Sequence, residues 1–185
     1  MRKEIRIAGF GGQGVVLAGY VLGKALALYA GREAVMTQSH GPEARGGASS
    51  ADLVVSEEPI AYPFVQQPDI LVVLSQEAYT KFRSSAKPAA LVLIDGDLVS
   101  PEEGDQIKAI PATQLAEDLG RRIVANVVML GFFTAVTGLV DPQAMLMALE
   151  TSVKAKTLPL NLNAFQAGFE YKPSCEEKVV VEGAS

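Results

Sequence analysis

A glycine-rich turn near the amino terminus is the first feature of this sequence that could do chemistry. Residues 9–14 read G-F-G-G-Q-G, which contains the spacing G-x-G-x-x-G. Such a turn lets backbone N–H groups approach an anion closely at the start of a helix. Gly11, Gly12, Gln13 and Gly14 are therefore candidate contacts for a phosphate-bearing ligand or a partner's backbone. The alternative is that the glycines only permit a tight turn and close helix–strand packing.

A second loop, Ser39 to Ser50, places titratable and cationic side chains among glycines and other small residues. An arginine there could bind a carboxylate or phosphate with two parallel hydrogen bonds. A histidine could titrate near neutral pH, although a hydrogen-bonding role is the more common one. The alternative is a solvated surface loop. The candidate contacts in this loop are His40, Gly41, Glu43, Arg45, Gly46 and Gly47.

The composition excludes several classes of site. The chain of 185 residues has a single cysteine, Cys175, and a single histidine. One cysteine cannot hold an iron–sulfur cluster, and one histidine cannot build a multi-histidine metal site. The formal net charge of −5 disfavours nucleic acid as a partner. The absence of cysteine pairs indicates a reducing compartment, so we expect a cytoplasmic protein.

Alternating segments predict an α/β fold, in which a mostly parallel sheet is flanked by helices. The continuous apolar runs at 69–75 and 90–95 are typical of strands buried on both faces. The glycine turn should join a first strand to an apolar helix. We expect strands at 4–10, 34–38, 51–55, 69–75, 90–95 and 107–110, and helices at 15–29 and 76–84.

The last third of the chain is predicted to be helical. Thr113 is a plausible N-cap of one helix, and Asp141-Pro142 should begin another that ends at Pro159. A short final helix is expected over 161–167, ending at Gly168. The segment Ile123–Val140 carries no charged residue and approaches the length of a membrane span. Because polar residues and glycines dilute it, we predict a buried or interface helix there.

Asn126, within that uncharged segment, is predicted to cap its helix and is a further candidate contact. We expect one domain over residues 1–170 and a tail over 171–185. In a parallel sheet, the loop after the second strand would lie beside the first glycine turn. Dinucleotide binding further requires an acidic residue at the end of the second strand. Here that strand ends at Gln38-Ser39-His40, which argues against NAD, although a stand-alone nucleotide-binding oxidoreductase is kept as an alternative.

The two glycine motifs, in this order, resemble the gamma subunit of the 2-oxoacid:ferredoxin (acceptor) oxidoreductases. The second motif reads G-P-E-A-R-G-G over residues 41–47. Three later segments match the same family pattern, namely 68–72, 126–131 and 163–168. The resemblance spans residues 4 to 168, and within the family it is strongest to the 2-oxoglutarate type.

The resemblance implies oxidative decarboxylation of a 2-oxoacid with coenzyme A, giving an acyl-CoA and reduced ferredoxin. Thiamine diphosphate and iron–sulfur clusters would belong to sibling alpha, beta and possibly delta subunits, so this chain alone would bind no cofactor and be inactive. Its implied role is to pack on the catalytic subunits and help shape the approach of coenzyme A. A purely structural scaffold is a further alternative, and a self-dimer is expected as one way to cover apolar surface in the isolated chain.

Overall fold

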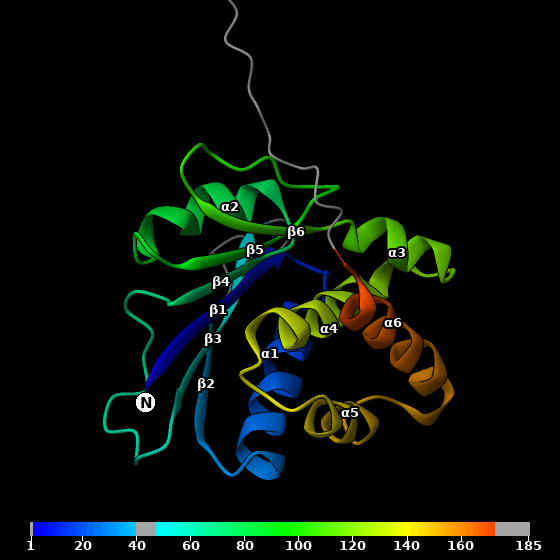
Figure 1. The fold of residues 1–185 in the computed structure, drawn as a ribbon, viewed down its shortest axis with the longest axis horizontal. Coiled ribbons are helices and arrows are strands. Elements are labelled where there is room, and N and C mark those ends of the chain that lie inside the picture. Colours follow the sequence, from blue (N-terminus) through cyan, green and yellow to red (C-terminus); the bar gives the residue numbers. More distant parts are fainter. Residues whose placement is uncertain (1, 40–46, 173–185) are drawn as a thin grey trace, which may run out of the picture.

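The computed structural model describes residues 2–39 and 47–172, which form a six-stranded sheet with helices on both faces (Figure 1). The predictions for His40, Gly41, Glu43, Arg45, Gly46 and Cys175 fall outside these residues. The strands are β1 (Lys3–Phe10), β2 (Glu33–Ser39), β3 (Ala48–Ser56), β4 (Ile70–Val73), β5 (Leu91–Asp95) and β6 (Gln106–Ile110). The α-helices are α1 (Val15–Lys24), α2 (Gln76–Phe82), α3 (Ala112–Asp118), α4 (Ala125–Thr137), α5 (Pro142–Glu150) and α6 (Leu158–Glu170).

The sheet has the strand order β2-β3-β1-β4-β5-β6. The prediction of a mostly parallel sheet flanked by helices is confirmed, because β1 pairs in parallel with β4, β4 with β5, and β5 with β6. One strand runs the other way. β3 lies between β1 and β2 and is antiparallel to both, so β1 and β2 themselves point in the same direction.

The register brings the ends of β1 and β2 to one rim of the sheet. Phe10 is opposite Ala48, Gly9 is opposite Ser49, and Ser39 is opposite Ser50. The glycine turn that follows β1 therefore begins beside the residues that flank the second loop. The sequence predicted that the loop after β2 lies beside the glycine turn, and for residues 40–46, outside the described part of the chain, this stays a prediction.

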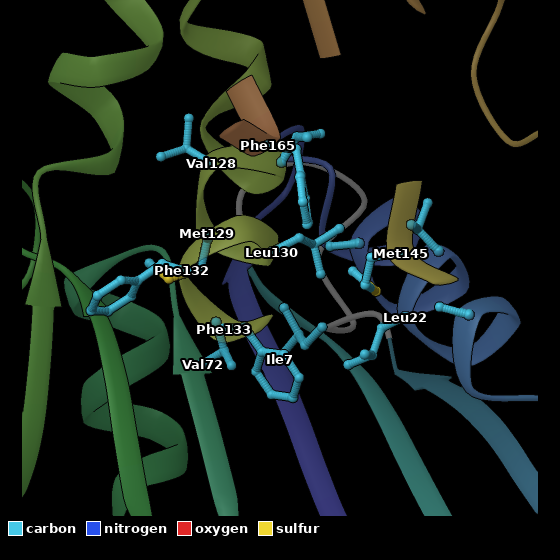
Figure 2. Packing of buried hydrophobic residues seen from close by; sticks show 14 of the residues in the cluster. Ile7, Leu22, Val72, Val128, Met129, Leu130, Phe132, Phe133, Met145 and Phe165 are labelled. Atoms are coloured by element: carbon cyan, nitrogen blue, oxygen red, sulfur yellow. The ribbon is translucent and has the colours of Figure 1, made fainter. Parts of the chain in front are cut away.

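Unequal helical layers cover the two faces of the sheet (Figure 1). On one face α1, α4, α5 and α6 enclose the larger core, in which Ile7 and Val72 of the sheet lie against Phe133 of α4 (Figure 2). On the other face α2 covers a smaller cluster that includes Tyr79 and Val73.

The uncharged segment is a buried helix, as predicted. Residues 126–134 of α4 are all buried, and α4 packs closely on α6. The two helices approach each other through glycines: a Cβ at Gly131 would overlap the carbonyl oxygen of Phe165, and one at Gly168 would overlap that of Val128. Within the described residues, no helix combines the length and apolar character that crossing a membrane requires.

Two predicted helix caps are wrong, and a third is confirmed. α3 begins one residue before Thr113, whose N–H and hydroxyl instead donate to the buried carboxylate of Asp95 at the end of β5 (3.3 and 2.6 Å). α4 begins before Asn126, whose side chain bonds elsewhere. The third prediction holds, because Asp141 Oδ1 accepts the N–H of Gln143 at the start of α5 (2.8 Å).

The boundaries of two other helices also differ from the prediction. Pro159 lies in the first turn of α6, where a missing N–H costs no hydrogen bond, so it begins this helix instead of ending the previous one. α6 then continues through Gly168 to Glu170 because the glycine allows contact with α4. The first helix is α-helical only to Lys24 and ends in a π-helical turn, Ala25–Tyr29.

Candidate functional site

The glycine turn between β1 and α1 has a defined left-handed geometry at two of its residues. Gly12 has φ of 96° and Gly14 has φ of 73°, both in the region that favours glycine. The N–H of Gln13 donates to the carbonyl of Phe10 (3.1 Å), which closes the turn. Residues with a side chain would be strained at both glycines.

The side chain of Gln13 clamps the turn from within. Its Oε1 accepts the N–H of Phe10 (2.6 Å), and its Nε2 donates to the carbonyl of Leu74, just after β4 (2.7 Å). A Cβ at Gly9 would lie 2.8 Å from this Oε1, so glycine is needed there to admit the amide. Both the oxygen and the nitrogen of the Gln13 side-chain amide are therefore hydrogen-bonded within the chain. Gln13 acts directly on the shape of the turn.

Asn126 supports the turn from behind. It is buried, with 3% of its surface exposed, and its Nδ2 donates to the carbonyl of Gly14 (3.0 Å). A Cβ at Gly14 would overlap that same nitrogen. The carbonyl of Gly14 also accepts the N–H of Ala18 (3.0 Å), so one oxygen fixes both the turn and the first turn of α1.

Gly11 differs from its neighbours because none of the described residues requires a glycine there. Its φ lies outside the left-handed region, and a Cβ would have no atom within 4 Å. Gly11 and Gly12 are exposed. Among the described residues, the N–H groups of Gly11, Gly12 and Gly14 have no hydrogen-bond acceptor. The turn therefore offers main-chain donors outward, at the positive end of α1.

Lys81 of α2 is a cation at this rim that sequence reasoning missed. Its Nζ donates to the carbonyl of Ala48 (3.4 Å), and Ala48 is the cross-strand partner of Phe10. Ser49 adds a second link across the rim, since its hydroxyl donates to the carbonyl of Gly9 (3.3 Å). No motif marks Lys81, because only the packing of α2 on β3 brings it to this rim.

The structure gathers a part of the predicted site at one rim. Gly11, Gly12, Gln13 and Gly14 form the turn, Asn126 lies behind it, and Gly47 precedes the strand that pairs with β1. A cavity of about 10 Å³ under the turn, lined by Ile7, Ala18 and Asn126 among others, has room for a water molecule and for nothing larger. A ligand at this rim would therefore contact the outer surface of the turn and would not enter this cavity.

A cluster of hydrogen-bonded charged groups lies at the end of α2, where it meets the segment before β6. Arg83 Nε donates to Asp105 Oδ2 (2.7 Å), and Arg83 also bonds the second oxygen. These bonds lower the pKa of Asp105. Burial, together with the hydrogen bond from its hydroxyl to Asp105, raises the pKa of Tyr79. The cluster ties α2 to the sheet edge, and within residues 2–39 and 47–172 no group of His, Cys, Asp and Glu is arranged to hold a metal.

Comparison with known proteins gives consistent matches over nearly the whole chain. The sequence profile of the family described as Pyruvate ferredoxin/flavodoxin oxidoreductase matches residues 4–171. The chain is 52% identical over 175 residues to 2-oxoglutarate synthase subunit KorC of Methanocaldococcus jannaschii, a match that covers 92% of this chain and 94% of the relative. It is 36% identical to ketoisovalerate oxidoreductase subunit VorA of Methanothermobacter thermautotrophicus, covering 91% of this chain and 36% of that longer one.

Two solved structures share the fold. The gamma subunit of keto/oxoacid ferredoxin oxidoreductase from Geobacter sulfurreducens superposes with a TM-score of 0.84 at 41% identity, covering 92% of this chain and 95% of that one. The 2-oxoglutarate:ferredoxin oxidoreductase from Magnetococcus marinus, solved with 2-oxoglutarate, coenzyme A and succinyl-CoA bound, gives a TM-score of 0.81 at 25% identity. That match covers 90% of this chain and 30% of the other.

Proposed function

The chain belongs to the pyruvate ferredoxin/flavodoxin oxidoreductase family, and from this membership we propose that it is the gamma subunit of a 2-oxoglutarate:ferredoxin oxidoreductase. The complex converts 2-oxoglutarate and coenzyme A to an acyl-CoA and carbon dioxide while it reduces ferredoxin. The relative named for 2-oxoglutarate is 52% identical, whereas the one named for ketoisovalerate is 36% identical. This difference supports 2-oxoglutarate as the substrate.

Sibling subunits carry the cofactors in this proposal. Thiamine diphosphate would form the bond to the 2-oxoacid, and iron–sulfur clusters would take up the electrons. With one cysteine in the whole sequence, this chain lacks the thiolate set that a cluster needs. We therefore assign residues 1–170 to packing on alpha, beta and possibly delta subunits in the cytoplasm, with 171–185 as a tail.

The glycine turn is proposed to receive an anionic group of coenzyme A at the subunit boundary. The observation that carries this assignment is Gly11, whose φ lies outside the left-handed region and whose Cα has no described residue crowding it, and which yet has no side chain. A glycine that no contact with the described residues requires is explained if a ligand must approach its Cα atom. The N–H groups of Gly12 and Gly14 have no acceptor in the described part of the chain. Together with the start of α1 and the ammonium group of Lys81, they would favour an anion there.

Substitution of Gly11 by alanine tests this role with little effect on the fold. Gly11→Ala adds a methyl group that meets no atom of residues 2–39 and 47–172, so the stability should stay unchanged. In the reconstituted complex we expect the KM for coenzyme A to rise about tenfold, while the KM for 2-oxoglutarate stays the same. Gly96→Ala is the matched control, because its Cβ would make only ordinary contacts, 3.6 Å and longer.

The outcomes separate three roles of the turn. A higher KM for coenzyme A supports the assignment. Weaker assembly with unchanged kinetics would make the turn a subunit contact instead. If Gly11→Ala matched the parent in assembly and kinetics, the glycines would serve the turn alone. Arg45 remains a prediction from sequence, and Arg45→Ala is expected to raise the same KM or to weaken assembly.

A further inference from the structure

Within residues 2–39 and 47–172, one edge of the sheet is left without a pairing strand. There β2 is the terminal strand, hydrogen-bonded to β3 on one side only. From Ala34 to Ser39 it carries no charge and no proline, whereas β6 at the opposite edge has Lys108 at its centre. Natural proteins usually protect edge strands with charges, prolines or bulges. The stretch Ala34–Ser39, which has none of these features, is a surface for a further strand.

An exposed tyrosine, Tyr20, lies on α1, the helix that packs on β2 and β3. In α1, Gly19 lies on the sheet against Ala51 of β3 and Met36 of β2. Ala18 points the other way, toward Ile7 and the core. Because successive helical residues are about 100° apart, Tyr20 lies on the flank of α1 opposite Ala18, with its ring centroid 5.7 Å from the ammonium nitrogen of Lys24. This side chain is 52% exposed.

We infer that a second copy of this chain adds to β2, antiparallel about a twofold axis at Met36. This occupant is argued from the strand's self-complementary sequence. With Met36 opposite its symmetry mate, Val35 faces Thr37 and Ala34 faces Gln38 of the other copy, while Glu33 faces Ser39. No like charges are opposed, and a β-branched pair forms on each side of the axis. The two sheets become one.

The two faces of β2 make this pairing testable with charges. Met36 faces α1, so Val35 and Thr37 point to the opposite face, where both are partly exposed. In the proposed register each of them is opposite the other across the axis. The double variant Val35→Lys/Thr37→Lys therefore places two pairs of like charges in contact. The variant Val35→Glu/Thr37→Lys places two opposite-charge pairs there instead, with the same lysine beside Asp52 of β3.

Sedimentation equilibrium of the full purified chain is the test. The parent should run at twice the chain mass of 19.5 kDa. We expect the two-lysine variant to raise the dimer dissociation constant at least about tenfold, and the lysine–glutamate variant to restore dimerisation. Circular dichroism on both variants checks that the strand is intact. The charge-swap rescue is specific to self-pairing in this register, because a foreign strand would not carry the matching charges.

Three results would overturn the inference: a monomeric parent at high concentration, equal association of both variants, or failure of the charge swap to restore the dimer. If the isolated chain is monomeric but hydrogen exchange shows β2 protected in the oxidoreductase complex, a sibling subunit supplies the added strand. The inference does not depend on the coenzyme A assignment. Gly11→Ala leaves β2 unchanged, so each proposal can fail without the other.

Discussion

The crossing of α4 and α6 gives a sharp test of the packing, through the substitution Gly131→Ala. The added Cβ would overlap the carbonyl oxygen of Phe165 and lie 2.8 Å from the nitrogen of Phe169, whereas ordinary contact begins at 3.4 Å. Both neighbours are backbone atoms of α6, so neither can rotate away. The helices must separate by more than half an ångström to admit one methyl group.

Two opposing effects set the size of the change. Alanine is favoured over glycine inside a helix by about 1 kcal/mol. Against this, separating the helices loosens Val128 and Phe132, both fully buried, and Phe165, and overpacking of a core costs about 1–3 kcal/mol and occasionally more. Because the clash is with backbone, we expect the upper end of this cost, about 3 kcal/mol, and therefore a net loss of about 2 kcal/mol. For a chain of this size that lowers Tm by roughly 4–8 °C.

Urea denaturation of the purified chain measures this loss as a lower midpoint with an unchanged slope. Gly23→Ala in α1 is the matched control, because its Cβ would meet only the flexible end of Leu53 at 3.3 Å. It should be neutral or stabilising by a few tenths of a kcal/mol. If Gly131→Ala were as stable as this control, the two helices would not be in backbone contact, and the reasoning would be refuted.

Three further predictions concern the turn and the charge cluster. Asn126→Ala removes the bond to Gly14 and should cost about 1–3 kcal/mol in urea denaturation, and an unchanged midpoint would contradict its supporting role. Gln13→Ala removes the hydrogen bonds to the N–H of Phe10 and the carbonyl of Leu74, so hydrogen exchange of the turn amides should accelerate at least tenfold while α2 stays protected. Exchange in the turn at the parent's rate would contradict the role of Gln13. Arg83 lowers the pKa of Asp105, so the pair stabilises the fold above the ordinary pKa of 3.8, and this stability is lost as the pH falls through the lowered value. Asp105→Asn should therefore lose about 1–3 kcal/mol at pH 7 and show a shallower decline in acid, and a pH profile parallel to the parent's would refute the assignment.

Two central strands, β4 and β5, could be predicted because they are continuous apolar runs. The segments 69–75 and 90–95 were recognisable from composition alone. The direction of β3 was not, because it depends on which distant strands it pairs with. Its first residues, Ala48 to Ser50, resemble a loop in sequence. They are buried only because β1, β2 and α2 surround them.

The candidate site was predictable in position and less so in the roles of its residues. Glycine spacing located the turn, and the parallel direction of β1 and β2 located the rim. The sequence could not show that Gln13 and Asn126 act on the turn from inside, because each bond reaches across a large separation in the chain. Lys81 was missed for the same reason. In each case a long-range contact decides the role.

The reversed strand β3 has a consequence for how this subunit can be altered. Its connection from β2 leaves at Ser39 and returns at Ala48, and both anchors are held in ladders at adjacent positions of one rim. The ladder contacts of these two anchors hold the strand order, so it does not depend on which residues fill positions 40–46. Replacing residues 40–46 with the equivalent stretch from another subunit of the family should therefore leave the sheet unchanged.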